Sequence, residues 1–163
     1  MAKGFKIKTN FSFKKLANKL PDIVSDSLNV MGNHINKAIQ DGLDKGEDIE
    51  GNPFEPLGPS TLALRKSRGH GTKILVASGK MRGTKKTPAT DSDPIFKLEM
   101  RKAYGAEHNE GYVVKKGRFK GSTVPKRKWF GIPKSALPGG KEWKKASLNR
   151  KFRIARALKT IMK

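Results

Sequence analysis

The sequence feature that most constrains the fold is an amphipathic pattern over residues 22–44, where apolar side chains recur at steps of three and four. This spacing places one apolar stripe along an α-helix. Lys45 and Gly46 follow directly and are typical of a helix end. We therefore predict one long helix that buries a single face, with apolar positions Val24, Leu28, Met31, Ile35, Ala38 or Ile39, and Leu43.

The segment before this helix predicts an arm and a short helix. Phe5, Ile7 and Thr9 alternate with lysines, which is typical of an edge strand or an arm. Asn10 or Ser12 can cap a short helix that extends to residue 20. Pro21 is then expected either to end that helix or to begin the next one at its first position.

Three prolines in residues 51–61 exclude regular structure and predict a fixed extended path after the long helix. Phe54 and Leu57 are expected to anchor this path. Pro59 can begin a short helix, because proline is tolerated in the first turn. Residues 68–73, rich in glycine and basic side chains, predict a mobile basic loop.

The remaining segments predict short strands and two helices. Ser78 can cap a one-turn helix, and residues 84–90 and 95–101 read as a hairpin across the turn 91–94. A short helix or turn is expected at residues 104–110, a strand at 112–114, and a flexible basic loop containing Phe119 at 115–128. After a Pro-Gly-Gly break, residues 141–163 predict a C-terminal helix with an apolar stripe under a cationic face, which could be a swinging arm.

These elements predict the α+β class: a long amphipathic helix packed on a small antiparallel β-sheet, with extended arms and a C-terminal helix. At 163 residues the chain is long enough for one domain with a core. We divide it into an N-terminal arm and short helix (1–20), a core domain (21–132) and a basic helical extension (133–163).

The charge is large and uneven. The chain carries 36 Lys and Arg against 14 Asp and Glu, a formal net charge of +22. Residues 22–55 hold eight acids against two lysines, whereas residues 111–163 hold 17 basic residues against Glu142 alone. Such a charge favours a polyanionic partner, with nucleic acid first and an acidic protein surface second. The asymmetry also suits head-to-tail contact between copies.

Composition argues against several classes of function. Cysteine is absent, which excludes disulfides and thiolate chemistry, and the three histidines show no metal-binding spacing. We expect no cofactor, no metal, no membrane span and no secretion signal. Gly79 and Lys80 lack the spacing of a phosphate-binding loop. Asp91, Asp93, Glu99 and His108 are the one plausible nuclease cluster, but the two aspartates suit turn positions better, so we expect a protein that is not an enzyme.

Five motifs in order carry a family resemblance. After the long helix come Gly51-Asn-Pro-Phe-Glu-Pro-Leu-Gly-Pro-Ser-Thr61-Leu, Ile74-Leu-x-x-Ser78-Gly79-x-Met81, Tyr104-x-Ala-x-x-His108-x-x-Gly111 and Val124-Pro-x-Arg127-x-x-Phe130-Gly131. In this order the chain resembles the Mu-type phage virion morphogenesis family over residues 20–132. Proteins of that family act at the head-to-tail junction or in tail completion.

The resemblance implies a homo-oligomeric ring, a hexamer or dodecamer, at the neck of the virion. Other neck and tail proteins would be its partners, and genomic DNA would pass through it. The protein would be assembled in the host cytoplasm. Residues 124–131 would close the sheet and meet a neighbouring subunit. A free-standing nucleic-acid-binding protein without sequence preference stays the alternative.

A ring around DNA needs attraction to phosphates with little base reading, which scattered cations provide. Trp129 and Phe130 suit core or intersubunit anchors better than base-stacking platforms. The DNA-facing candidates are Lys115, Lys116, Arg118, Lys120, Lys126, Arg127 and Lys128, followed by Arg65, Lys66 and Arg68. The subunit-contact candidates are Trp129, Phe130, Ile132, Phe54 and Leu57.

Overall fold

A single helix, α1 (Phe13–Lys45), is the spine of the computed structural model, which describes residues 12–76, 83–101, 104–117 and 119–161. At 1.5 Å per residue its 33 residues span about 50 Å. The side chain of Ser12 caps its start by accepting the Lys15 N–H at 3.3 Å. Gly46 ends it in the left-handed region, with φ of 79°, and donates its N–H to the Gly42 carbonyl. The long helix and its C-terminal signal are thus confirmed.

The helix does not break at Pro21, so the predicted boundary between residues 20 and 21 is wrong. Pro21 lies inside α1, eight residues after the helix begins. Proline lacks an N–H and crowds the preceding turn, but its φ is compatible with a helix. Because Ser12 supplies a cap upstream, the chain is already helical when it reaches Pro21. The predicted strand around Phe5 lies outside the described residues.

Two small antiparallel hairpins take the place of a single sheet. β1 (Thr84–Thr87) pairs with β2 (Lys97–Met100), with Thr84 opposite Met100. β3 (Tyr112–Val113) pairs with β4 (Thr123–Val124), with Tyr112 opposite Val124. The β1–β2 hairpin was predicted, although its strands are shorter than the pattern indicated. Of the second hairpin only β3 was predicted as a strand, and β4 lies within the predicted loop 115–128, so the loop prediction is wrong at Thr123 and Val124. The predicted Ser78 turn lies outside the described residues.

Polar side chains on α1 hold the β1–β2 hairpin. The amide of Asn29 bonds both backbone groups of Ala89, accepting its N–H at 2.8 Å and donating to its carbonyl at 3.0 Å. Ser25 donates to Asp91 at 2.9 Å, and Thr84 donates to Asn36 at 2.5 Å. Gly32 lies under the ring of Phe96, where a Cβ would clash. The hairpin is therefore fixed to the helix by hydrogen bonds and by one close approach.

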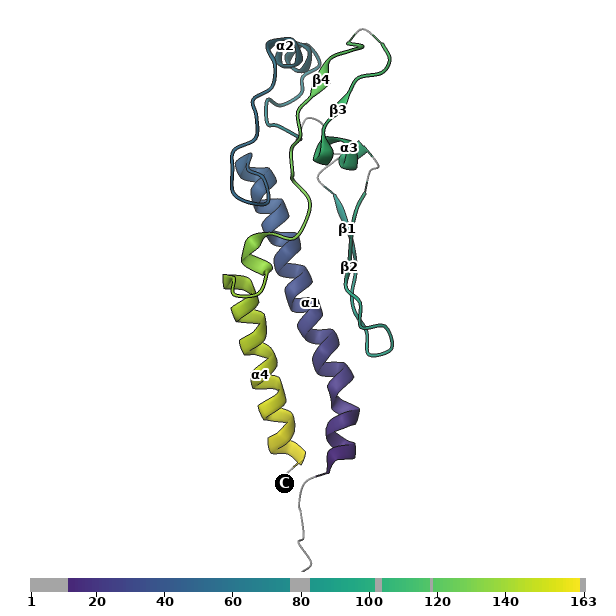
Figure 1. Cartoon of the computed structure of the whole chain (residues 1–163), viewed down its shortest axis with the longest axis vertical. Helices are drawn as coiled ribbons and strands as arrows, with labels where there is room; N and C mark the ends of the chain where they lie inside the picture. Colours follow the sequence, from purple (N-terminus) through teal and green to yellow (C-terminus); the bar gives the residue numbers. More distant parts are fainter. Residues whose placement is uncertain (1–11, 77–82, 102–103, 118, 162–163) are drawn as a thin grey trace, which may run out of the picture.

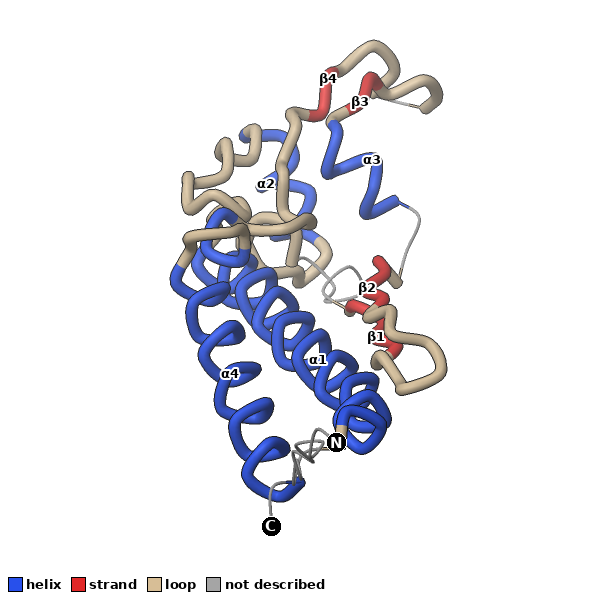
Figure 2. The backbone as a smooth tube through the Cα atoms, turned by 60° about the horizontal axis from the view of Figure 1, so that its bottom comes forward, coloured by secondary structure: helices blue, strands red, loops and turns tan. Residues whose placement is uncertain are grey.

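The remaining elements complete two ends of the molecule (Figure 1). At one end, which we call the head, lie α2 (Pro59–Ser67), α3 (Tyr104–Glu110) and the β3–β4 hairpin. A short 3₁₀ helix, η1 (Lys134–Ala136), leads to α4 (Lys141–Ile161). Figure 2 shows α4 on one side of α1 and the β1–β2 hairpin on the other.

α4 packs along α1 and is not a swinging arm. Between the two helices, Nδ1 of His34 lies 3.2 Å from the carboxylate of Glu142, and Asp26 forms an ion pair with Arg153. Residues 133–161 are therefore part of the folded body rather than a separate extension. Among the described residues, no helix is long and apolar enough to cross a membrane.

The buried core lies at the C-terminal half of α1, where the helix meets the head. Its buried members are Ile39, Leu43, Phe54, Leu75 and Trp129. The indole of Trp129 is 1% exposed and donates to the Gly105 carbonyl at 3.1 Å. This core joins α1, the proline-rich segment, α3 and residues 124–131 into one body.

Candidate nucleic-acid interface

The head collects cations from two segments that are about 50 residues apart in the sequence. Lys66 and Arg68 are exposed at the end of α2, and Lys115, Lys116 and Lys120 are exposed on the β3–β4 hairpin. Both segments lie at the same end of the molecule (Figure 1) and line one cavity. Arg118 lies outside the described residues.

Glycines at left-handed positions build the tip of the hairpin. Gly117 and Gly121 have φ of 85° and 88°, conformations that glycine adopts without steric cost. Between them the chain turns, and Val114 and Ser122 continue the ladder through a bond from the Val114 N–H at 2.9 Å. The β3–β4 hairpin, with its lysines, therefore projects from the head (Figure 1).

Lys126 and Lys128 are exposed but are already tied to carboxylates. Lys126 bonds Glu110 at 2.8 Å, and Lys128 bonds Glu50 at 3.0 Å. The bond and charge of Lys126 lower the pKa of Glu110, and Lys128 and Lys134 do the same for Glu50. The bond from Glu50 raises the pKa of Lys128. These two lysines fasten residues 124–131 to the rest of the head and have less charge to offer to DNA than those of the hairpin tip.

Arg127 is only 5% exposed, so its predicted place on a DNA-facing surface is wrong. Its Nη2 donates to the Glu55 carbonyl at 3.1 Å, and its Nε–H is buried with no hydrogen-bond partner among the described residues. Burial lowers the pKa of Arg127, Glu55 opposes this shift, and Arg65 adds to it. An unpaired buried donor costs about 1–3 kcal/mol. The alternation of residues 124–129 turns Arg127 inward between two outward lysines.

Arg65 is half-buried and also has a local structural role. Its Nη1 donates to the carbonyls of Lys73 at 2.7 Å and Gly71 at 3.4 Å, which fastens the loop after α2. Burial lowers the pKa of Arg65. Of the three α2 candidates, Lys66 and Arg68 therefore remain as freely exposed surface cations.

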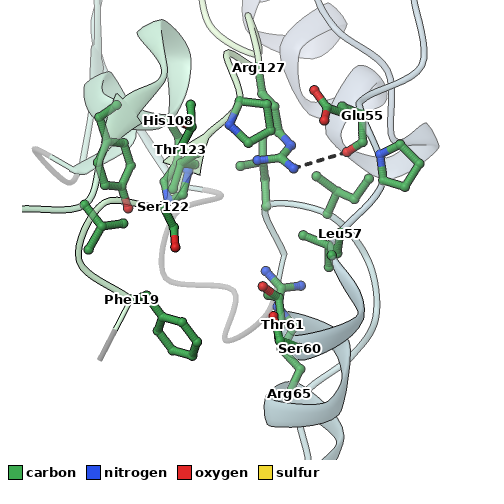
Figure 3. Close-up of a pocket in the computed structure, with 18 of the residues that line it drawn as sticks. Glu55, Leu57, Ser60, Thr61, Arg65, His108, Phe119, Ser122, Thr123 and Arg127 are labelled. Atoms are coloured by element: carbon green, nitrogen blue, oxygen red, sulfur yellow. Dashed lines mark hydrogen bonds between the residues drawn. The ribbon is translucent and has the colours of Figure 1, made fainter. Parts of the chain in front are cut away.

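A cavity of about 570 Å³ lies between α2, the proline-rich segment and the β3–β4 hairpin (Figure 3). In Figure 3, Arg65 extends from α2 toward the guanidinium of Arg127, and Phe119 lies on the opposite side. Apolar side chains such as Leu57, Leu64 and Val124 contribute to the walls. Glu55 supplies the one carboxylate among the lining residues that the structure describes.

His108 shares this positive environment. It lines the cavity from α3, and its ring makes an edge contact with Tyr112 at 5.7 Å between centroids. Burial lowers the pKa of His108, and the charges of Arg127 and Arg65 lower it further against the opposing effect of Glu107. This lowering of the His108 pKa favours the neutral form of the imidazole.

The five subunit-contact candidates differ in how far their side chains are buried. Trp129 and Phe54 are enclosed in the chain's own core, which corrects their assignment to a subunit contact. Phe130 and Leu57 are half-buried. Ile132 is 59% exposed and remains available for contact with a neighbour.

The acids that could have formed a nuclease site do not converge with His108. Asp91 bonds Ser25 beside α1, and Glu99 pairs with Lys85 at 3.6 Å on the β1–β2 hairpin. In the described part of the chain, no group of three His, Asp or Glu side chains is placed to hold a metal ion. The cavity itself was missed by sequence reasoning, because its walls come from segments whose approach no local pattern encodes. The one signal in the sequence was the alternation of side chains around Arg127, which indicates that Arg127 points inward.

A model of the phage virion morphogenesis family matches residues 8–148 of the chain. The match includes the whole of α1, the whole head and the first turns of α4. No curated protein and no solved structure gives a significant match.

Proposed function

The chain belongs to the phage virion morphogenesis family, and from this membership we propose that it is a structural subunit of an oligomeric ring at the head-tail junction of the virion. In this proposal the ring connects portal-side and tail-side components and surrounds the DNA channel. The role is mechanical and not catalytic. Its partners are further copies of the chain, other neck and tail proteins, and the passing genome.

The observation that carries the proposal is the gathering of exposed cations at the head. Lys66, Arg68 and the hairpin lysines come from separate segments, yet they occupy one end of the molecule. Exposed lysines on a projecting turn attract phosphates without reading bases, because they contact the backbone alone. A channel lining must tolerate any sequence, and this arrangement meets that need.

Exposed apolar side chains support contact with neighbours. Ile132 follows the head core, Leu148 and Phe152 lie one turn apart on α4, and Phe152 is 67% exposed. Apolar residues of this size on a surface are typical of protein interaction sites when they cluster. A ring subunit needs such surfaces on the faces that do not meet DNA.

The DNA contact can be tested by the salt dependence of binding to a duplex of random sequence. We expect the triple variant Lys115→Gln, Lys116→Gln, Lys120→Gln to flatten the slope of log K against log salt by about 2–3, since each phosphate contact contributes about 0.9. The matched control is Lys37→Gln, Lys85→Gln, Lys97→Gln, which removes three exposed lysines paired with Asp41, Glu99 and Asp93. Equal slopes for the two triple variants would remove the hairpin from the DNA interface.

A further inference from the structure

The cavity of the head combines a cationic wall with apolar walls, which a surface for DNA does not require. Arg65 and Arg127 line it together with Leu57, Leu64 and Phe119. We propose that this cavity binds an acidic peptide segment of another protein, in which a carboxylate stands beside an apolar side chain. The inference goes beyond the proposed ring, since it concerns the interior of the head and not the exposed lysines.

The case for a carboxylate begins with Arg127. Its side chain is more than nine-tenths buried, and its Nε–H has no partner in the described part of the chain. Arg65 lies close enough to depress the pKa of Arg127. A guanidinium fork binds a carboxylate with two parallel bonds, and an anion between two arginines relieves their repulsion. Two guanidinium groups therefore line the cavity against the carboxylate of Glu55, the one acid among its described lining residues, which leaves an excess of positive charge for an anion to neutralise.

The walls favour a peptide over a nucleic acid. Leu57, Leu64, Val114 and Val124 face the space and can pack against an aliphatic side chain. A DNA backbone carries no such group beside its phosphates. Phe119 could stack on an unpaired base, so single-stranded DNA is the competing occupant that an experiment must separate.

Another protein is a better source of the segment than a second copy. Seven of the chain's 14 acidic side chains lie in ion pairs in the described structure, namely Asp26, Asp41, Glu50, Asp93, Glu99, Glu110 and Glu142. A copy that offered one of these groups would first have to break an internal pair. A partner whose carboxylate is free avoids this cost. A second copy also carries a net charge of +22, which opposes its docking into a cationic cavity.

The test uses the full-length protein and two acetylated tripeptide amides, Leu-Asp-Leu and Leu-Asn-Leu. Binding is followed by ¹H–¹⁵N NMR at the Arg127 Nε–H and at the amides of residues 122–124. We expect Leu-Asp-Leu to shift these resonances and to bind about tenfold or more tighter than Leu-Asn-Leu, because hydrogen bonds to a charged group are the stronger ones. A thymidine oligonucleotide serves as the third probe.

Two variants from the same helix end provide the control. Arg65→Gln removes a charge that lines the cavity, whereas Arg68→Gln removes one that does not. We expect the first to abolish the preference for Leu-Asp-Leu and the second to preserve it. Ser122→Trp fills the mouth from an exposed position and should block the peptide without altering Arg65.

Three results would overturn the inference. Equal binding of the two peptides would show that no carboxylate is recognised. Shifts at Arg127 Nε–H with the oligonucleotide alone would assign the cavity to nucleic acid. Dissociation of the protein's own oligomers on addition of Leu-Asp-Leu would assign it to a second copy. None of these depends on the salt slope of the hairpin lysines, so failure here leaves the proposed ring untouched.

Discussion

Trp129 joins the head to the long helix through one enclosed side chain. Its ring contacts Phe130 edge-on at 5.5 Å between centroids, and its indole N–H satisfies the carbonyl of Gly105 in α3. Gly105 is also the position where a Cβ would come within 3.0 Å of the indole. The fit between α3 and residues 124–131 therefore depends on this pair of residues.

We predict that Trp129→Phe lowers the free energy of unfolding by about 1–3 kcal/mol, because the buried Gly105 carbonyl loses its partner. Urea denaturation would measure the change. Trp143→Phe is the control, since Trp143 is 37% exposed on α4 and should cost less than about 1 kcal/mol. Equal costs at both positions would contradict the anchoring role of Trp129.

His108 should make the stability of the head depend on pH. Its folded pKa is lowered by burial and by Arg127 and Arg65, against the effect of Glu107. The unfolded chain then binds more protons than the folded chain below about pH 6.5, so the free energy of unfolding falls as the pH drops through that value. We predict that His108→Gln reduces the loss of stability between pH 7.5 and 5.5, measured by urea denaturation. His70→Gln, at an exposed position, should leave the loss unchanged.

At the scale of elements, the β1–β2 hairpin is attached to α1 through polar groups as well as through Leu98 and Met100, which pack against the core. Asn29 bonds the backbone of Ala89 as a neighbouring strand would, and Ala89 is buried. Hairpins of four residues per strand are marginal alone. The position of the hairpin is therefore set by the side chains of the helix.

We predict that Asn29→Ala destabilises this attachment by about 1–3 kcal/mol, because both backbone groups of Ala89 lose their partner. Amide hydrogen exchange at Ala89 should accelerate by about tenfold or more. Asn18→Ala, at an exposed site on the same helix, should leave exchange at Ala89 unchanged. Unchanged exchange in Asn29→Ala would show that apolar contacts hold the hairpin.

Pro21 offers a second element-scale prediction. Pro21→Ala should raise the free energy of unfolding by up to about 3 kcal/mol, since it restores a donor inside α1. Amide exchange across residues 13–20 should slow. Pro59→Ala in the first turn of α2 is the control and should be close to neutral. Destabilisation by Pro21→Ala would mean that the proline ring itself makes a needed contact.

Local patterns were sufficient for elements with a strong period or a clear end signal. The helix over residues 22–44, the Pro59 helix and the turn at 91–94 follow from side-chain spacing and turn chemistry. The helix boundary predicted at Pro21 was wrong because the cap at Ser12 starts the helix upstream of the proline. The burial of Arg127 and the cavity depend on tertiary contacts between distant segments, which spacing alone does not determine.

At the scale of the whole molecule, the charge of +22 opposes any close assembly of copies. A closed ring of such subunits needs a counter-charge, which DNA in the channel can supply. In the folded chain the exposed cations of the head lie at one end, and the α1–α4 pair extends away from it (Figure 1). We predict that the head is the end directed to the channel.

Electron cryomicroscopy of the assembled phage particle tests this account most directly. We predict a closed ring of this chain at the head-tail junction, with Lys115, Lys116 and Lys120 directed toward the DNA on the channel axis. A neck without this chain, or a ring whose β3–β4 hairpins point away from the channel, would contradict the account.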